Sequence, residues 1–340
     1  MEIFTSNGWN LFPIIKKFDM KQLLVLTFLA ASLAAGQTPH KTSKADVDRY
    51  MKELSNWGRW GKQDQLGTYN LITPAKRKEA AALVKEGVSV SLAHNVEKVA
   101  GPDNNNPFKH TIEDAGAYAN EYYLDSYAVN YHGFAHTHMD SLCHMFHDGQ
   151  MYNGFSTREL TKQGAQKLAI DGFKNGILSR AILMDIPKLK GVPFLPAGTA
   201  IYPEDLEAWE KKTGIKVRAG DVVLIYTGRW AARTKNGAWE ISKKAAGLHA
   251  SCAPWLKQRD VAILGSDGAS DVLPSLVDGV TQPIHQLVLI AMGMPILDNL
   301  DMEELSKAAA KYNRYEFMLS AAPLAVAGGT GSPLNPIATF

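Results

Sequence analysis

The spacing of apolar residues changes along this chain, with regular alternation of strands and helices after about residue 180. Thr73 and Pro74 are typical of a helix start, with Thr73 as the N-cap and Pro74 as the first helical residue. Residues 100–107, with two prolines and three asparagines, predict a loop that could act as a lid. Helices are predicted at 46–57, 73–85, 156–168, 203–213, 254–258, 285–292 and 301–311, and strands at 88–92, 121–130, 134–140, 179–185, 221–226, 261–264, 295–297 and 317–326.

This order of elements predicts an α/β fold with a mixed sheet. The segments 121–130 and 134–140 are expected to pair as neighbouring strands. The chain of 340 residues can form one large domain, and no convincing linker divides it. We therefore expect one domain over residues 56–340, preceded by a linker and leading helix at 37–55.

The N-terminal residues 1–36 are typical of an export signal region, with Met20 as the expected start. Met20 and Lys21 form a short positive segment, residues 23–33 are apolar, and small residues follow. The apolar stretch is too short to span a membrane comfortably, so no stable membrane insertion is expected. The prediction is an exported protein, periplasmic or secreted. An N-terminal apolar helix that stays attached is the alternative.

Composition narrows the range of partners. The chain is 46% hydrophobic and 21% charged, with a net charge of +2 and no basic stripe interleaved with aromatic residues. Nucleic acid is therefore not an expected partner, whereas a small-molecule substrate is. The sequence leaves the oligomeric state open, including a homo-oligomer. Cys143 and Cys252 are expected to be two packed or semi-exposed thiols, with a single disulfide or a metal–thiolate role as the alternatives.

A cluster of ligand-type residues lies within positions 132–144, comprising His132, His136, His138, Asp140 and His144. In an extended strand alternate side chains share a face, so His136, His138 and Asp140 would point the same way. A bend after the strand could bring His144 back over them. Imidazole and carboxylate together suit zinc or manganese better than calcium or copper. The spacing therefore predicts a metal site on this strand.

The His138-x-Asp140-x-x-x-His144 spacing resembles the signature of the metal-dependent cyclase family, which includes kynurenine formamidases and isatin hydrolases. Stretches at 265–268, 283–286 and 297–300 resemble later motifs of that family, and 56–61 and 328–333 resemble a longer branch of it. The likeness runs from about residue 56 to residue 340. It implies the swivelling β/β/α fold with a mixed sheet.

The resemblance also implies a ligand set of one or two ions. His138 and Asp140 fall on metal-ligand positions, and Asp140 could bridge two ions. His285 falls on the distal histidine ligand, and Asp298 falls where the family usually has glutamate. His144 falls on the proton-transfer residue.

One expected ligand is replaced in this chain. The first histidine of the family pattern falls on Phe134, which cannot bind a metal. His136 is the natural substitute because it would lie on the same strand face, and His132 is the second choice. Asp267 and Asp271 could orient a ligand histidine or cap a turn.

The function implied by the resemblance is hydrolysis of a carbon–nitrogen bond in an amide, formamide or cyclic amide. That activity would be arylformamidase-like, as in tryptophan catabolism to kynurenine. His144, with an ordinary pKa near 6.5, could transfer the proton. Trp57 and Trp60 could wall an aromatic substrate, or could pack structurally. A lactone hydrolase and a non-catalytic exported protein that binds a metal or ligand are the alternatives.

Overall fold

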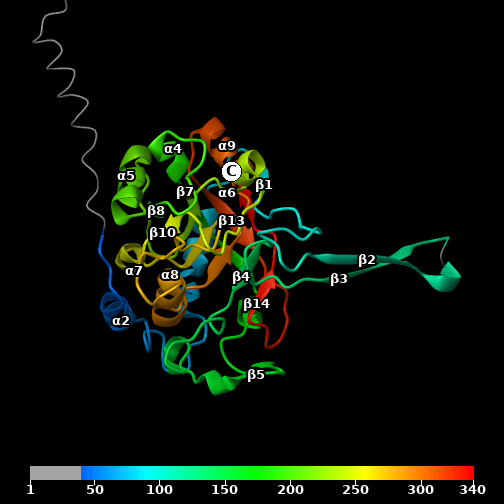
Figure 1. Ribbon diagram of the computed structural model, residues 1–340, viewed down its shortest axis with the longest axis horizontal. Coiled ribbons are helices and arrows are strands. Elements are labelled where there is room, and N and C mark those ends of the chain that lie inside the picture. The colour runs from blue at the N-terminus through cyan, green and yellow to red at the C-terminus, as the bar shows by residue number, and fades with distance from the viewer. Residues whose placement is uncertain (1–39, 119) are drawn as a thin grey trace, which may run out of the picture. The chain divides into compact units, whose positions relative to one another are not determined.

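A mixed sheet of nine strands forms the centre of the described part of the chain, residues 40–118 and 120–340 of this computed structural model (Figure 1). The strand order is β1-β15-β13-β7-β9-β11-β12-β4-β14. Four neighbouring strands run parallel, namely β7 (Ile177–Asp185), β9 (Val222–Tyr226), β11 (Ile263–Ser266) and β12 (Ile296–Asp298). The flanking strands pair antiparallel, namely β1 (Ser89–Ser91), β4 (His138–Asp140), β13 (Glu316–Ala321), β14 (Gly331–Pro333) and β15 (Ile337–Thr339). The predicted α/β fold with a mixed sheet is confirmed.

Three small two-stranded sheets and a set of helices complete residues Lys41–Phe340, which form one compact unit. The small sheets pair β2 (Lys109–Asp114) with β3 (Tyr123–Ala128), β5 (Leu160–Thr161) with β6 (Gly164–Ala165), and β8 (Ala200–Ile201) with β10 (Gly247–Leu248). The α-helices are α2 (Lys44–Glu53), α3 (Pro74–Ala81), α4 (Ile186–Lys190), α5 (Pro203–Thr213), α6 (Arg229–Asn236), α7 (Ala253–Gln258), α8 (Pro283–Gln286) and α9 (Glu303–Tyr312). The π-helix η7 (Leu287–Met292) continues α8, and short 3-10 turns are η1 (Gly67–Leu71), η2 (Gly116–Tyr118), η3 (Tyr152–Gly154), η4 (Thr157–Glu159), η5 (Ile170–Phe173) and η6 (Ala250–Cys252).

Local sequence signals account for several of these elements. The Thr73 side chain accepts a hydrogen bond from the backbone N–H of Lys76, and Pro74 opens α3, as predicted. Helix α5 begins at Pro203 and ends at Gly214, whose left-handed conformation is one that glycine adopts without strain. Every residue of β9 is buried, which is typical of a central parallel strand covered on both faces.

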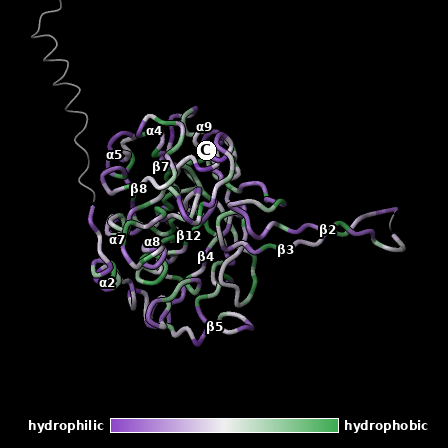
Figure 2. Tube along the Cα trace, viewed as in Figure 1, coloured by the Kyte–Doolittle hydropathy of each residue, from purple (hydrophilic) through white to green (hydrophobic). Residues whose placement is uncertain are grey.

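One large hydrophobic core surrounds the parallel strands, and hydrophobic residues concentrate there (Figure 2). Cys143 and Cys252 are both buried free thiols, so the disulfide alternative is excluded. No helix of the described residues has the length and apolar character needed to cross a membrane. The predicted export signal at residues 1–36 lies outside the described residues.

Two predictions of secondary structure were wrong. Strand β3 pairs with β2, whereas the segment after it contributes only the short strand β4, which pairs with β12 and β14. Residues 156–168 form the turn η4 and the small β5–β6 sheet instead of a helix. The side chain of Ser156 does cap this segment, accepting from the backbone N–H of Arg158. The helical spacing of its apolar residues is therefore overridden by the tight turn.

Candidate metal centre

The strand β4 positions the first two candidate ligands. His138 and Asp140 are two residues apart and share one face, while Met139 points the other way into the core. In the antiparallel register His138 lies opposite Asp298 of β12. Directly opposite residues of paired strands project to the same side of the sheet. The sheet therefore places three candidate ligands from two strands on one face.

Two overlapping groups of side chains have the composition and spacing of metal sites. One group comprises His132, His138 and Asp140, and the other comprises Asp140, His285 and Asp298. Within each group the ligand atoms lie within 4.8 Å of one another. Asp140 belongs to both groups and is 1% exposed. The arrangement is that of one ion site, or of two ion sites that share a carboxylate.

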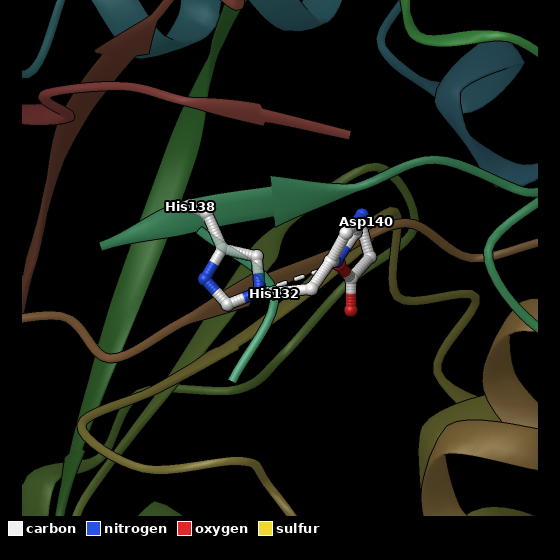
Figure 3. A group of neighbouring side chains, drawn as sticks. All are labelled: His132, His138 and Asp140. Atoms are coloured by element: carbon white, nitrogen blue, oxygen red, sulfur yellow. Dashed lines mark ion pairs between the residues drawn. The ribbon is translucent and has the colours of Figure 1, made fainter. Parts of the chain in front are cut away.

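The side chains of the first group converge on Asp140 (Figure 3). The Oδ1 atom of Asp140 lies 2.9 Å from Nδ1 of His132 and 3.3 Å from Nε2 of His138. The other nitrogen of each ring is already engaged. Nδ1 of His138 lies 2.8 Å from the backbone oxygen of His136, and Nε2 of His132 lies 3.0 Å from the Thr330 hydroxyl. These outer contacts fix the ring orientations and leave one nitrogen of each histidine facing the carboxylate.

The second group has its own orienting residue. His285 places Nε2 at 3.1 Å from Oδ2 of Asp298 and at 3.8 Å from Oδ2 of Asp140. Its Nδ1 lies 2.7 Å from Oδ2 of Asp271, which also accepts hydrogen bonds from the backbone N–H groups of Ile284 and His285. A carboxylate behind a histidine is a common support for a metal ligand. The orienting role considered for Asp271 therefore matches its contacts.

Unpartnered atoms at the centre fit a bound cation. Oδ1 of Asp140 and Nδ1 of His132 are both buried and have no hydrogen-bond partner with acceptable geometry, although they lie 2.9 Å apart. Leaving such buried polar atoms unsatisfied costs about 1–3 kcal/mol each. Imidazole nitrogens and carboxylate oxygens are the donors that zinc and manganese accept. The residues present therefore fit such an ion.

The buried charges at this centre shift one another's pKa. Burial by itself would raise the pKa of Asp140, but the neighbouring His138 and His144 rings outweigh it and hold that pKa well below its usual range. Burial would lower the pKa of His138, but Asp140 reverses the effect and raises it. The pKa of His285 is likewise raised well above its usual value, because Asp298 and Asp271 outweigh burial. The cluster therefore favours a cation next to its carboxylates.

His144 lies beside the first group without belonging to it. Its ring stacks on the ring of His132 with centroids 3.9 Å apart, and its Nε2 lies 3.8 Å from Oδ2 of Asp140. Burial lowers the pKa of His144 to about 4, although Asp140 opposes the shift. The side chain is therefore neutral at pH 7 and has a free electron pair for a proton.

His136 lies outside both ligand groups, which differs from the sequence prediction. Strand β4 begins only at His138, so the alternation of side chains does not extend back to His136. Nε2 of His136 lies 3.2 Å from the backbone oxygen of Asn106, and the ring belongs to neither ligand group. His132, the second choice from the sequence, takes the place beside Asp140. The structure therefore brings His132, and not His136, close to Asp140.

A cavity of about 180 Å³ adjoins this centre, because His132 belongs to both the cavity lining and the first ligand group. His136 and Phe134 also line it, together with Ile241 and asparagines of the 100–107 loop. The cavity is smaller than the ~300–1,000 Å³ of typical drug-sized ligand sites, which limits the size of a ligand there.

The two tryptophans expected to wall a substrate do not line this cavity. The indole N–H of Trp57 donates to the backbone oxygen of Ile290 at 2.7 Å, and Trp57 lines a separate cavity of about 550 Å³ that His147 also lines. The ring of Trp60 lies under the guanidinium of Arg59, 4.7 Å from its centroid. Substrate binding by Trp57 and Trp60 stays a prediction.

A buried arginine links the segments around the centre, and no motif in the sequence predicted this role. The Arg229 guanidinium donates to Oδ1 of Asn299 at 2.7 Å and to the backbone oxygen of Phe134. The Asn299 amide in turn donates to the backbone oxygens of Gly133 and His136. Asn299 directly follows Asp298, so this network ties the β12 ligand to the turn that precedes β4.

Asp267 has a different role from Asp271. Its carboxylate accepts hydrogen bonds from the backbone N–H groups of Thr227, Gly228 and Arg229, where helix α6 begins. This arrangement stabilises the positive end of the helix. Of the two roles considered for Asp267, the capping role therefore matches its contacts.

Comparison with known proteins gives the family. The family described as "Putative cyclase" matches residues 90–270. A solved structure described as a novel cyclase is 30% identical, covers 85% of this chain and 99% of its own, and superposes with a TM-score of 0.76. None of the curated proteins searched matches the chain.

Two isatin hydrolases share the fold at lower identity. Isatin hydrolase A from Ralstonia solanacearum is 19% identical, with a TM-score of 0.51, over 74% of this chain and 91% of its own. Isatin hydrolase A from Labrenzia aggregata, bound to benzyl benzoate, is 18% identical, with a TM-score of 0.52, over 76% of this chain and 94% of its own. The family match over residues 90–270 and the similarity to the novel cyclase show that the chain belongs to the cyclase family.

Proposed function

We propose that this protein is a metal-dependent hydrolase that cleaves the carbon–nitrogen bond of a small amide, formamide or cyclic amide. The observation that carries the proposal is the pair of ligand groups that share the buried carboxylate of Asp140. Membership of the cyclase family supports it, and the sequence resemblance to kynurenine formamidases supports an arylformamidase-like reaction.

The residues that would hold the metal are His132, His138, Asp140, His285 and Asp298. A bound zinc or manganese ion would activate water and polarise the substrate carbonyl group. Asp140 lies between the two groups, so one ion or two ions can be held. Asp271 and Thr330 keep His285 and His132 oriented through the hydrogen bonds described above.

His144 is the proposed proton-transfer residue. Its ring is neutral at pH 7 because burial lowers its pKa to about 4, so it can accept a proton from the attacking water. It can then donate that proton to the departing nitrogen. The stacked ring of His132 restricts the orientation of His144 and keeps its Nε2 near Asp140.

The cavity beside His132 sets the proposed substrate class. Its volume of about 180 Å³ favours a small substrate, and the asparagines that line it offer neutral donors and acceptors. Phe134 and Ile241 add apolar surface. A small neutral molecule with an amide group and an apolar portion fits this lining best.

The proposal is tested by metal content and turnover measured together. We expect the purified protein to bind zinc or manganese and to hydrolyse members of a panel of formamides, cyclic amides and lactones. His144→Ala should keep the metal but lose about 10²–10⁴-fold in kcat. His147→Ala is the matched control, because His147 lines the separate cavity near Trp57, and it should keep full activity.

Three results would contradict the proposal. The protein could remain metal-free under saturating zinc and manganese, which would remove its chemical basis. A metal-loaded protein with no turnover on any member of the panel would instead indicate a non-catalytic binding protein. Turnover of lactones without turnover of amides would indicate the lactone hydrolase considered from the sequence.

A further inference from the structure

Ile241 lies between two cavities. It lines the cavity of about 180 Å³ beside His132, and it also lines a smaller cavity of about 10 Å³ that Arg229 and Trp239 line as well. A space of about 10–15 Å³ holds one water molecule. The Ile241 side chain is 2% exposed, so it forms a filled wall that both cavities share. One side chain therefore closes this end of the cavity beside the metal centre.

Hydrogen bonds and apolar packing hold the turn that carries Ile241. The backbone N–H of Lys244 donates to the Ile241 oxygen at 3.1 Å, and the indole N–H of Trp239 donates to the Lys244 oxygen at 2.7 Å. Ala245 exchanges two backbone hydrogen bonds with Leu273, at 2.9 and 3.0 Å. Ile241, Ala245 and Leu273 also form a small apolar cluster. These contacts keep the Ile241 side chain in place at the end of the cavity.

The smaller cavity beyond Ile241 contains a charged donor without a partner. Arg229 lines this cavity, and its Nε is buried with no hydrogen-bond partner among the described residues. The other two nitrogens of the guanidinium are engaged, since Nη1 donates to Oδ1 of Asn299 and Nη2 donates to the backbone oxygen of Phe134. Much of the remaining lining is apolar and includes Leu195 and Ala232. A water molecule can satisfy Nε there, and so can an acceptor atom of a ligand that displaces the water.

We propose that Ile241 determines the size of the substrate, and that Nε of Arg229 recognises an acceptor on any ligand group that extends past it. This inference rests on the proposed function and deepens it. With the amide at the metal centre, the far end of the substrate meets the apolar side chain of Ile241. The substrate class is therefore a small amide whose end remote from the amide is apolar and carries no hydrogen-bonding group.

Shortening the side chain at position 241 should change this selection in two ways. Ile241→Ala removes three carbon atoms from the shared wall and joins the smaller cavity to the larger one. A mismatch of one methylene group in an apolar pocket changes selectivity by about 10–200-fold, so a ligand that the wall excludes should gain affinity. A hydrogen bond from the charged Nε of Arg229 should add about 10-fold for a ligand that carries an acceptor.

Isothermal titration calorimetry with three formamides tests the proposal. The ligands are formanilide, N-(4-isopropylphenyl)formamide and N-(4-acetylphenyl)formamide, of which the last two have nearly the same shape but differ in the acceptor. The zinc-loaded His144→Ala protein is used so that the ligands are not turned over. We expect it to bind formanilide at least about 10-fold more tightly than either substituted ligand. Adding Ile241→Ala should raise the affinity for both substituted ligands by about 10–100-fold, with the acetyl ligand about 10-fold ahead.

Three further variants serve as controls in the same background. Leu273→Ala is the matched control, because Leu273 belongs to the same apolar cluster but lines neither cavity, and it should leave the ligand preference unchanged. Ile241→Val removes one carbon atom, so it should give an intermediate gain even where Ile241→Ala folds poorly. Adding Arg229→Lys to Ile241→Ala places a methylene group where Nε was and keeps the positive charge. The preference for the acetyl ligand should then disappear, whereas the gain for the isopropyl ligand should remain.

Four results would overturn the proposal. These are no detectable binding of formanilide, equal affinities of the His144→Ala protein for all three ligands, an equal gain in the Leu273→Ala control, and an acetyl preference that survives Arg229→Lys. Turnover is measured separately, with His144 intact. Size selection in binding without hydrolysis of formanilide would contradict the proposed function but would support the size limit set by Ile241. Hydrolysis of all three ligands with equal kcat/KM would support the proposed function and overturn that size limit.

Discussion

Replacing the buried arginine of the ligand network tests how the turn before β4 is held. Arg229→Met keeps much of the side-chain volume but removes the donors to Asn299 and to the backbone oxygen of Phe134. The Arg229 side chain is 3% exposed, and its guanidinium also packs over the Trp230 ring at 4.0 Å from the centroid. The loss leaves one buried and one partly buried acceptor without this donor.

The expected loss in the free energy of unfolding follows from two opposing effects. A hydrogen bond from a charged donor contributes about 1.5–3 kcal/mol, so two such bonds contribute about 3–6 kcal/mol. Burial lowers the pKa of Arg229 to about 10 although Asp103 opposes the shift, so holding the charge in this site costs part of that gain. We therefore expect Arg229→Met to lower the free energy of unfolding by about 3 kcal/mol.

Arg233→Met is the matched control, because Arg233 contacts the same Asp103 carboxylate at 2.6 Å but its side chain is 25% exposed. Its loss should cost less than that of Arg229, because solvent screens its partly exposed ion pairs with Asp103 and Glu97. Denaturant unfolding followed by circular dichroism, with linear extrapolation to water, measures both. An equal or larger loss in Arg233→Met would refute the reasoning about the buried network.

Three further predictions concern the metal centre and the stability of the fold at acidic pH. Zinc at 100 times its dissociation constant should stabilise the native protein by about 2.7 kcal/mol, seen as a higher thermal midpoint, and a chelator or His138→Ala should abolish the gain. Asp271→Asn should weaken metal affinity about 10–100-fold by releasing His285, measured by competition with a chromophoric chelator, whereas Ser270→Ala, which touches Asp298 only at 3.4 Å, should change it little. Burial would raise the pKa of Glu210, but hydrogen bonds from Arg259, the Val217 backbone and Lys216 outweigh it and lower that pKa. At pH values above its pKa in the unfolded state, Glu210 therefore stabilises the fold. This stabilisation is lost as pH falls through its lower pKa in the folded state. The gap in unfolding free energy between the native protein and Glu210→Gln should shrink from pH 6 to pH 3, and a constant gap would contradict this.

Some elements could be predicted from local sequence signals alone, either from the residues at their ends or from an apolar run. Helix α5 begins at a proline and ends at a glycine, and the observed bounds Pro203–Thr213 match the predicted range. Apolar runs located the parallel strands β9 and β11, because strands buried on both faces need such residues. The two-residue spacing of His138 and Asp140 was enough to place both on one face of a strand. The family resemblance then supplied the distant His285 and Asp298, which helix α8 and the register of β12 bring together with them.

Only the tertiary structure decided where that strand begins and what supports the ligands. Alternation along 134–140 predicted a longer strand and therefore His136, but β4 has three residues, since the preceding turn is held by Asn299 and Arg229 from other elements. The pairing of β3 with β2 was hidden for a related reason. Both faces of the β2–β3 hairpin are exposed, so no pattern of buried side chains specifies its register. Contacts between residues far apart in sequence, such as those of Asp271 and Thr330 with their histidines, depend on the packing of the whole sheet, which no local pattern encodes.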